Sequence, residues 1–103
     1  MDKFEHWGYA KETDSFYNGS IYCGCFDKEG RRSGYGKLSY LNGSFYEGEF
    51  MNDKKSGIGT EVSCNGDLYE GSFYEDQYHG YGVVSYLNGQ IWEGRFENGR
   101  KVR

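Results

Sequence analysis

The sequence predicts an all-β fold: a single curled antiparallel meander of β-hairpin repeats that forms a trough. One observation behind this prediction is a segment that begins with Asn-Gly, continues with alternating aromatic and polar residues, and recurs about every 23 residues, which is typical of repeat architectures. The other is composition, because the 103 residues include 17 glycines and no proline, and 19% are aromatic. Disordered chains of low complexity lack aromatic residues, so a folded domain is expected.

Four copies of the repeat begin at Asn18, Asn42, Asn65 and Asn88. The first copy is one residue longer, and the extra residue falls in its polar loop, where an insertion leaves the strand faces unchanged. We expect the segment before the first copy to be a capping strand with a bulge or an irregular start. The predicted organisation is this capping segment, three full copies, a partial copy and a basic tail: residues 1–17, 18–41, 42–64, 65–87, 88–99 and 100–103.

Each Asn-Gly pair predicts a hairpin with a two-residue type I′ turn, because that turn needs positive φ at both central positions. Pairing outward from Asn42-Gly43 and its copies fixes the predicted register. It sets an apolar residue opposite each phenylalanine: Tyr35 with Phe50, Ile58 with Phe73, and Tyr81 with Phe96. It also sets Glu61 directly across from Glu70, which is destabilising for two like charges.

One face of the predicted sheet carries an aromatic residue, a glycine and a phenylalanine from each repeat. A glycine such as Gly48 lets the neighbouring rings lean over the backbone and lets the sheet bend. Stable domains usually have two layers, whereas this sheet has one. We therefore expect part of the aromatic face to bind a protein partner. The candidate protein-binding residues are Tyr22, Phe26, Tyr35, Tyr46, Phe50, Tyr69, Phe73, Tyr81, Trp92 and Phe96.

The repeats resemble those of the MORN (membrane occupation and recognition nexus) family over residues 18–99. The chain departs from the family pattern at Cys23, where an acidic residue is usual. The resemblance implies a non-enzymatic scaffold that dimerises, docks a helical or extended segment in its trough, and belongs to a cytoskeletal or ciliary assembly in the cytoplasm. In some members it implies contact with phosphoinositides. The motifs that carry it are Tyr46-Glu47-Gly48-Glu49-Phe50 with Gly57-Ile58-Gly59, Tyr69–Phe73 with Gly80-Tyr81-Gly82, Tyr22–Gly36, and Trp92–Phe96.

The formal net charge is −4, which argues against nucleic acid as the main ligand. An acidic row recurs on the face opposite the aromatic one, formed by Glu47, Glu70 and Glu93. Either basic side chains of adjacent strands or a basic partner would balance this row.

A peripheral membrane adaptor is the alternative function. Arg31-Arg32 and Lys54-Lys55 occupy equivalent loops, and we expect both pairs on one edge of the trough. Basic residues near a membrane attract anionic lipid headgroups by ~1 kcal/mol each. The competing interpretation is a solvated loop edge without a ligand.

The sequence offers no convincing catalytic or metal-binding pattern, so we expect no enzymatic activity, metal or cofactor. Cys23 and Cys25 share a strand face, but a structural zinc site needs four ligands, and Cys64 lies in another repeat. His79 lacks the nucleophile and orienting acid that a catalytic histidine requires. The Gly-x-Gly motifs open no helix, which argues against a phosphate-binding loop. The odd number of cysteines fits a reducing, cytosolic compartment.

The fourth copy lacks its second strand. Asn98-Gly99 fits a turn, but the residues 100–103 that follow are mostly basic and are a poor partner strand. We therefore expect Ile91–Phe96 to be an open edge with uncovered aromatic side chains, and such edges are normally blunted or paired. A homodimer through this edge satisfies that need with one surface, and a different subunit is the alternative occupant.

Overall fold

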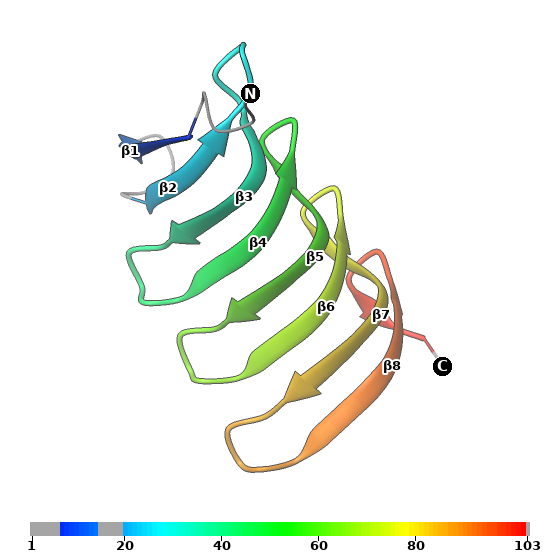
Figure 1. The fold of residues 1–103 in the computed structure, drawn as a ribbon. Coiled ribbons are helices and arrows are strands. Elements are labelled where there is room, and N and C mark those ends of the chain that lie inside the picture. Colours follow the sequence, from blue (N-terminus) through cyan, green and yellow to red (C-terminus); the bar gives the residue numbers. More distant parts are fainter. Residues whose placement is uncertain (1–6, 15–19, 103) are drawn as a thin grey trace.

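Nine antiparallel strands form one sheet, and each strand pairs with its neighbours in the chain (Figure 1). The computed structural model describes residues 7–14 and 20–102. In that part of the chain no helix is long and apolar enough to cross a membrane. The predicted all-β meander is confirmed. Its strands are β1 (Trp7–Asp14), β2 (Ser20–Phe26), β3 (Arg32–Ser39), β4 (Phe45–Met51), β5 (Lys54–Val62), β6 (Leu68–Tyr74), β7 (Gln77–Ser85), β8 (Ile91–Glu97) and β9 (Arg100–Lys101).

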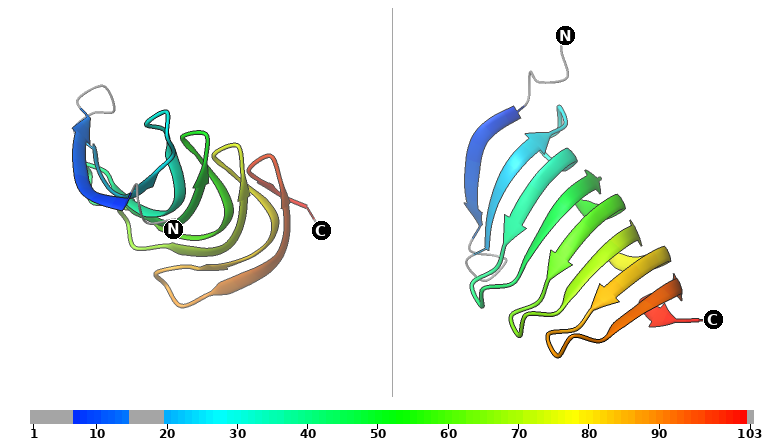
Figure 2. Two further views of the ribbon diagram at one scale, coloured as in Figure 1. Left: turned by 45° about the horizontal axis from the view of Figure 1, so that its top comes forward. Right: turned by 60° about the horizontal axis from the view of Figure 1, so that its bottom comes forward.

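The strands are curved and stack into a trough (Figure 2). A row of glycines crosses the sheet and lies where the strands bend. Because these residues have no side chain, the aromatic rings inside the trough lie directly on the backbone; a methyl group on Gly59, for example, would overlap the ring of Tyr46. The row consists of Gly8, Gly24, Gly36, Gly48, Gly59, Gly71, Gly82 and Gly94, each paired with the next.

The loops at Asn42-Gly43, Asn65-Gly66 and Asn88-Gly89 contain three residues, so the predicted two-residue type I′ turn is wrong at these positions. The prediction at Asn18-Gly19 lies outside the described residues. The amide of Tyr40 donates to the carbonyl of Ser44 at 2.9 Å, and the amide of Gly43 donates to the carbonyl of Tyr40 at 3.0 Å. Gly43 has a φ of 96°, whereas Asn42 does not have a positive φ. This geometry is a type I turn followed by a G1 bulge.

The longer loop shifts every predicted cross-strand pair by one residue. The three phenylalanines lie opposite glycines and not opposite the predicted apolar residues: Phe50 pairs with Gly34, Phe73 with Gly57, and Phe96 with Gly80. Glu61 pairs with Tyr69, and Glu70 with Thr60. The predicted repulsion between Glu61 and Glu70 is therefore also wrong.

Type I′ turns occur at the other ends of the hairpins. Both central residues have positive φ in three two-residue turns: Asn52-Asp53 (53° and 72°), Glu75-Asp76 (51° and 72°) and Asn98-Gly99 (51° and 86°). The corresponding loop of the first repeat has three residues and ends at Gly30, whose amide donates to the carbonyl of Asp27 at 2.9 Å. The extra residue of the first repeat thus lies in the predicted loop.

The two end strands differ from the repeats. β1 pairs with β2 through a register that shifts between Gly8 and Glu12. β9 pairs with the last two residues of β8, Phe96 and Glu97, and the amide of Val102 donates to the carbonyl of Arg95 at 2.7 Å. The prediction that the whole of Ile91–Phe96 is an open edge is therefore wrong for its C-terminal part.

Candidate protein-binding groove

Eight aromatic rings form a continuous ladder along the floor of the trough. Each ring meets the next edge to face, with centroids 4.8 to 5.3 Å apart. Such pairs add about 0.5–1.5 kcal/mol each to the stabilisation from burial. The ladder is therefore the core of the sheet. In spatial order it contains Phe26, Tyr22, Phe50, Tyr46, Phe73, Tyr69, Phe96 and Trp92.

The hydroxyl groups of three ladder tyrosines donate hydrogen bonds to backbone carbonyl groups at the bend of their own strand. Tyr22 donates to Cys25 O at 2.7 Å, Tyr46 to Glu49 O at 2.7 Å, and Tyr69 to Ser72 O at 2.8 Å. Each acceptor lies where the pairing with the following strand shifts register. Burial raises the pKa of the Tyr22 and Tyr46 hydroxyls well above the usual value and raises the pKa of Tyr69 to about 12.

One further side chain per repeat covers the ladder from inside the trough, and we call these four residues the capping row. Three are cations over a ring face, an arrangement worth about 0.5–1 kcal/mol at exposed sites, and one is a stacked ring. The pairs are Arg32 over Tyr22 (5.8 Å to the centroid), Lys55 over Tyr46 (5.4 Å), Tyr78 on Tyr69 (3.8 Å between centroids) and Lys101 over Trp92 (4.8 Å).

Two members of the capping row carry partly buried ion pairs. Arg32 contacts the carboxylate of Asp53 at 3.3 Å, and the Arg32 amide donates to the same oxygen at 2.7 Å. Lys55 contacts Glu61 at 3.1 Å, and its amide donates to Asp76 at 2.9 Å. Burial alone would lower the pKa of Lys55, but the Glu61 carboxylate and the Tyr40 hydroxyl together more than offset this and raise it. The type I′ turns thus hold the capping row in place.

A hollow of about 620 Å³ lies inside the trough above this network. Leu38 and Phe50 form part of its apolar floor. The Tyr40-Leu41-Asn42 hairpin end also lines it, as do Asp53 and Asp76 from the type I′ turns. Hairpin ends from both sides of the sheet therefore line one groove, whose walls carry charges of both signs.

The structure places the ten predicted protein-binding residues in two groups. Tyr22, Tyr46, Phe50, Tyr69, Phe73 and Phe96 are buried, and Phe26 and Trp92 are partly buried against them. Tyr35 and Tyr81 are 52% and 54% exposed and lie on the opposite, convex face, so their predicted position inside the trough is wrong. Protein binding by any of the ten stays a prediction.

The four predicted lipid-binding residues also fall into two groups, one that faces the trough and one that is exposed. Arg32 and Lys55 face the trough, and their side chains are only 13% and 12% exposed. Arg31 and Lys54 are 45% and 48% exposed, and each lies within 4.0 Å of a carboxylate. Both pairs lie at the same end of their hairpins, but two of the four side chains turn into the trough, so the four do not form one exposed basic edge, and each of them has an acidic neighbour.

The other candidate groups lie apart from the groove. Cys23 and Cys64 are exposed and Cys25 is partly exposed, and all three are free thiols. Among residues 20–102, no three His, Cys, Asp or Glu side chains come together as metal ligands. The His79 ring accepts a hydrogen bond from the Asn98 amide at 3.4 Å, so its side chain contacts the Asn98-Gly99 turn.

The groove residues that sequence reasoning missed are Tyr40, Asp53, Glu61, Asp76 and the capping-row residue Tyr78. A signal existed for one of them, because Arg32, Lys55, Tyr78 and Lys101 share one position of the repeat. The two cations Arg32 and Lys55 at that position suggest a basic edge when the sequence is considered alone. The cations and the tyrosine instead share one role, which is to cover a ring.

Comparison with known proteins agrees with this architecture. A family model for the MORN repeat matches three consecutive stretches, residues 22–45, 46–68 and 69–91. These stretches cover more than half of the chain, which therefore belongs to the MORN-repeat family. A search of curated proteins found no match. MORN repeats are non-catalytic modules that generally bind proteins or membranes.

Proposed function

We propose that this MORN-repeat chain is a non-enzymatic scaffold that binds a helical or extended segment of a protein partner in its groove. The observation that carries the proposal is the hollow of about 620 Å³ with an apolar floor and charged walls. Binding sites commonly combine an apolar base with a few placed polar groups that fix orientation. A partner segment in the groove would supply the second layer that a single sheet lacks.

The groove suggests the chemistry of the segment. Apolar side chains would contact Leu38 and the exposed side of Leu41, and polar groups would face Asp53 and Asp76 on the other wall. The ladder rings contribute mainly as a rigid floor, because a fully buried ring such as Tyr46 has no surface left to offer.

The test is affinity capture from a cell extract with the wild type and two matched variants. Leu41→Glu places a charge at the groove, where Leu41 is 78% exposed. Leu87→Glu makes the same change at the same loop position of a later repeat, where Leu87 is 73% exposed. We expect Leu41→Glu to lose the captured protein and Leu87→Glu to retain it. Retention by a folded Leu41→Glu variant would remove the groove as the site.

The proposal includes a place in a larger cytoplasmic assembly of cytoskeletal or ciliary type, which the MORN resemblance implies. Fluorescence microscopy of the tagged chain checks this location. It also includes a homodimer through the part of β8 that β9 does not pair.

Contact with anionic lipid is the weaker alternative. The exposed cations that it needs, Arg31 and Lys54, already have Asp27 and Glu75 beside them. Liposome flotation at low and physiological salt tests it, and binding that persists at physiological salt would favour it over the groove.

A further inference from the structure

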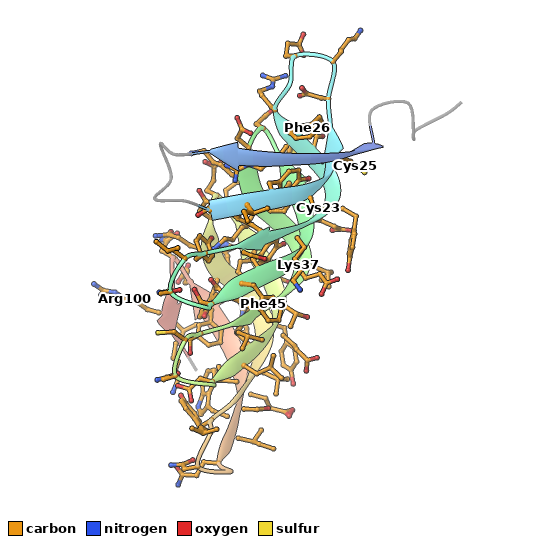
Figure 3. All side chains as sticks on the ribbon, turned by 90° about the vertical axis from the view of Figure 1, so that its left-hand side faces the viewer. Cys23, Cys25, Phe26, Lys37, Phe45 and Arg100 are labelled. Carbon is orange, nitrogen blue, oxygen red and sulfur yellow. The ribbon has the colours of Figure 1, made fainter. Side chains whose placement is uncertain are left out.

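The convex face of the sheet is a second surface without a covering layer. The core ladder lies on the other face, and in the described residues nothing packs on this one. Side chains two residues apart along a strand form parallel rows across the sheet. The central row contains Cys23, Lys37, Glu47, Thr60, Glu70, Val83 and Glu93, in strand order from β2 to β8. Figure 3 shows the beginning of this face at Cys23, Lys37 and Phe45.

Exposed or half-buried apolar side chains flank the central row on both sides. On one side lie Tyr35, Ile58 and Tyr81, which are 52%, 62% and 54% exposed. They alternate with the polar side chains of the intervening strands, Glu49, Ser72 and Arg95. On the other side Phe45, Val62 and Leu68 are directly paired neighbours, and Ile91 at the end of this row is 66% exposed. Several large apolar side chains exposed on one face commonly mark an interaction site.

The charge of the central row is acidic and regularly spaced. Glu47, Glu70 and Glu93 lie on alternate strands, and strands are 4.7–4.9 Å apart, so successive carboxylates are about 9.6 Å apart. None of the three forms an ion pair with another described residue within 4.0 Å. Glu47 and Glu93 accept hydrogen bonds from Tyr35 and Tyr81 at 3.0 and 2.6 Å. These bonds hold two of the carboxylates in place without neutralising them, and the one cation of the row, Lys37, lies opposite Glu47.

We propose that the convex face docks a basic amphipathic helix of a protein partner, which lies along the central row and crosses the strands. In an α-helix, residues seven apart lie on one face with a rise of about 10.5 Å, close to the spacing of the carboxylates. Apolar residues three and four positions after each basic residue flank it on that face. They would contact the two apolar rows while the basic residues pair with Glu47, Glu70 and Glu93.

This surface is separate from the groove, so one chain holds two partner segments on its opposite faces. The proposal does not depend on the groove being occupied. The acidic row also repels anionic lipid, which excludes a membrane as the occupant of this face.

The test uses a synthetic fluorescent peptide of three heptads, with lysine at every seventh position and leucine three and four residues after each lysine. Fluorescence anisotropy at physiological salt measures its affinity for the full chain. We expect binding that falls at least tenfold when Glu70→Lys and Glu93→Lys are combined. The matched control combines Glu29→Lys and Glu75→Lys, which reverses two exposed carboxylates in the hairpin loops and should preserve most of the affinity.

Three results would overturn the proposal: no binding of the peptide, equal binding of a scrambled peptide of the same composition, or an equal loss in the loop control. Light scattering addresses a second copy as occupant. Self-association that disappears in a Glu47→Lys/Glu70→Lys variant, whose changes lie outside β8, would assign the face to that copy instead of a helix. Circular dichroism confirms that each variant is folded, and Leu41→Glu should bind the peptide as the wild type does.

Discussion

The hydroxyl of Tyr46 donates a hydrogen bond of 2.7 Å to the carbonyl oxygen of Glu49, three residues further along the same strand. Removing this donor leaves a carbonyl at the bend without its partner, which costs about 1–3 kcal/mol when the group is buried. We expect Tyr46→Phe to lower the free energy of unfolding in urea by that amount. Tyr35→Phe removes an exposed hydroxyl that bonds Glu47 and should change it by less than about 0.5 kcal/mol. Equal effects of the two changes would contradict a structural role for the Tyr46 hydroxyl.

A methyl group on the glycine row should destabilise the sheet by steric overlap. Gly59→Ala places its Cβ against the Tyr46 ring, and overpacking of this kind typically costs about 1–3 kcal/mol or more. Gly43→Ala has open space around its Cβ but a φ of 96°, so its cost of about 1 kcal/mol comes from backbone strain. Urea denaturation compares the two. A smaller loss for Gly59→Ala than for Gly43→Ala would contradict the tight contact of ring and backbone.

Alkaline pH should unfold the protein. Burial raises the pKa of Tyr69 to about 12, above the usual value near 10 for an unfolded chain. Between these values the unfolded state has lost a proton that the folded state keeps, so stability falls as pH rises. We expect the melting temperature to be unaffected by this group below pH 9 and to fall between pH 10 and 12. Tyr69→Phe should have a shallower fall over that range, and an unchanged slope would argue against the buried hydroxyl.

Lys101 should protect the last ring of the ladder. Its ammonium group lies 4.8 Å from the centroid of the Trp92 ring, whereas Arg100 points away from the sheet (Figure 3). In a Trp7→Phe background, Lys101→Ala should shift the Trp92 fluorescence to longer wavelength and lower stability by about 0.5–1 kcal/mol. Arg100→Ala is the control and should do neither. A spectrum unchanged by Lys101→Ala would show that the lysine does not cover the ring in solution.

The uncovered part of β8 should mediate the proposed homodimer. Light scattering at high micromolar concentration should give a dimer for the wild type and a monomer for Ile91→Lys. Ile58→Lys changes a residue of similar exposure, 62% against 66%, on a strand in the middle of the sheet, and should leave the dimer intact. A wild-type chain that stays monomeric would leave this edge free for another protein.

The sequence was sufficient for the strands, their order and the position of the extra loop residue, because aromatic residues and glycines recur in phase. It was insufficient for the register. An Asn-Gly pair permits both a two-residue turn and the last two positions of a three-residue loop, and the choice between them moves every pair by one residue. The resulting alignment of glycine with glycine, as Gly36 with Gly48, was the internal signal that favoured the longer loop.

The groove was harder to predict than the fold for a physical reason. The type I′ turns at Asn52-Asp53 and Glu75-Asp76 hold non-glycine residues at positive φ. Each is supported by an aspartate carboxylate that binds an amide of the preceding repeat, as Asp53 binds Arg32. That support joins residues far apart in the chain, so local sequence preferences do not reveal it. The ion pair between Lys55 and Glu61 is also not revealed by local preferences, because the curl of β5 brings the two side chains together.

The glycine row also determines which dimension of the groove changes when a MORN array gains or loses repeats. The bend of the sheet is made within each repeat, by one glycine on each strand and the aromatic ring that lies over it. It does not depend on the ends of the array. Adding or removing copies would therefore change how long a segment the groove can hold while leaving its width unchanged. If the groove binds a partner segment as proposed, the number of repeats would set the length of that segment, and the bend at the glycine row would set the width of the groove.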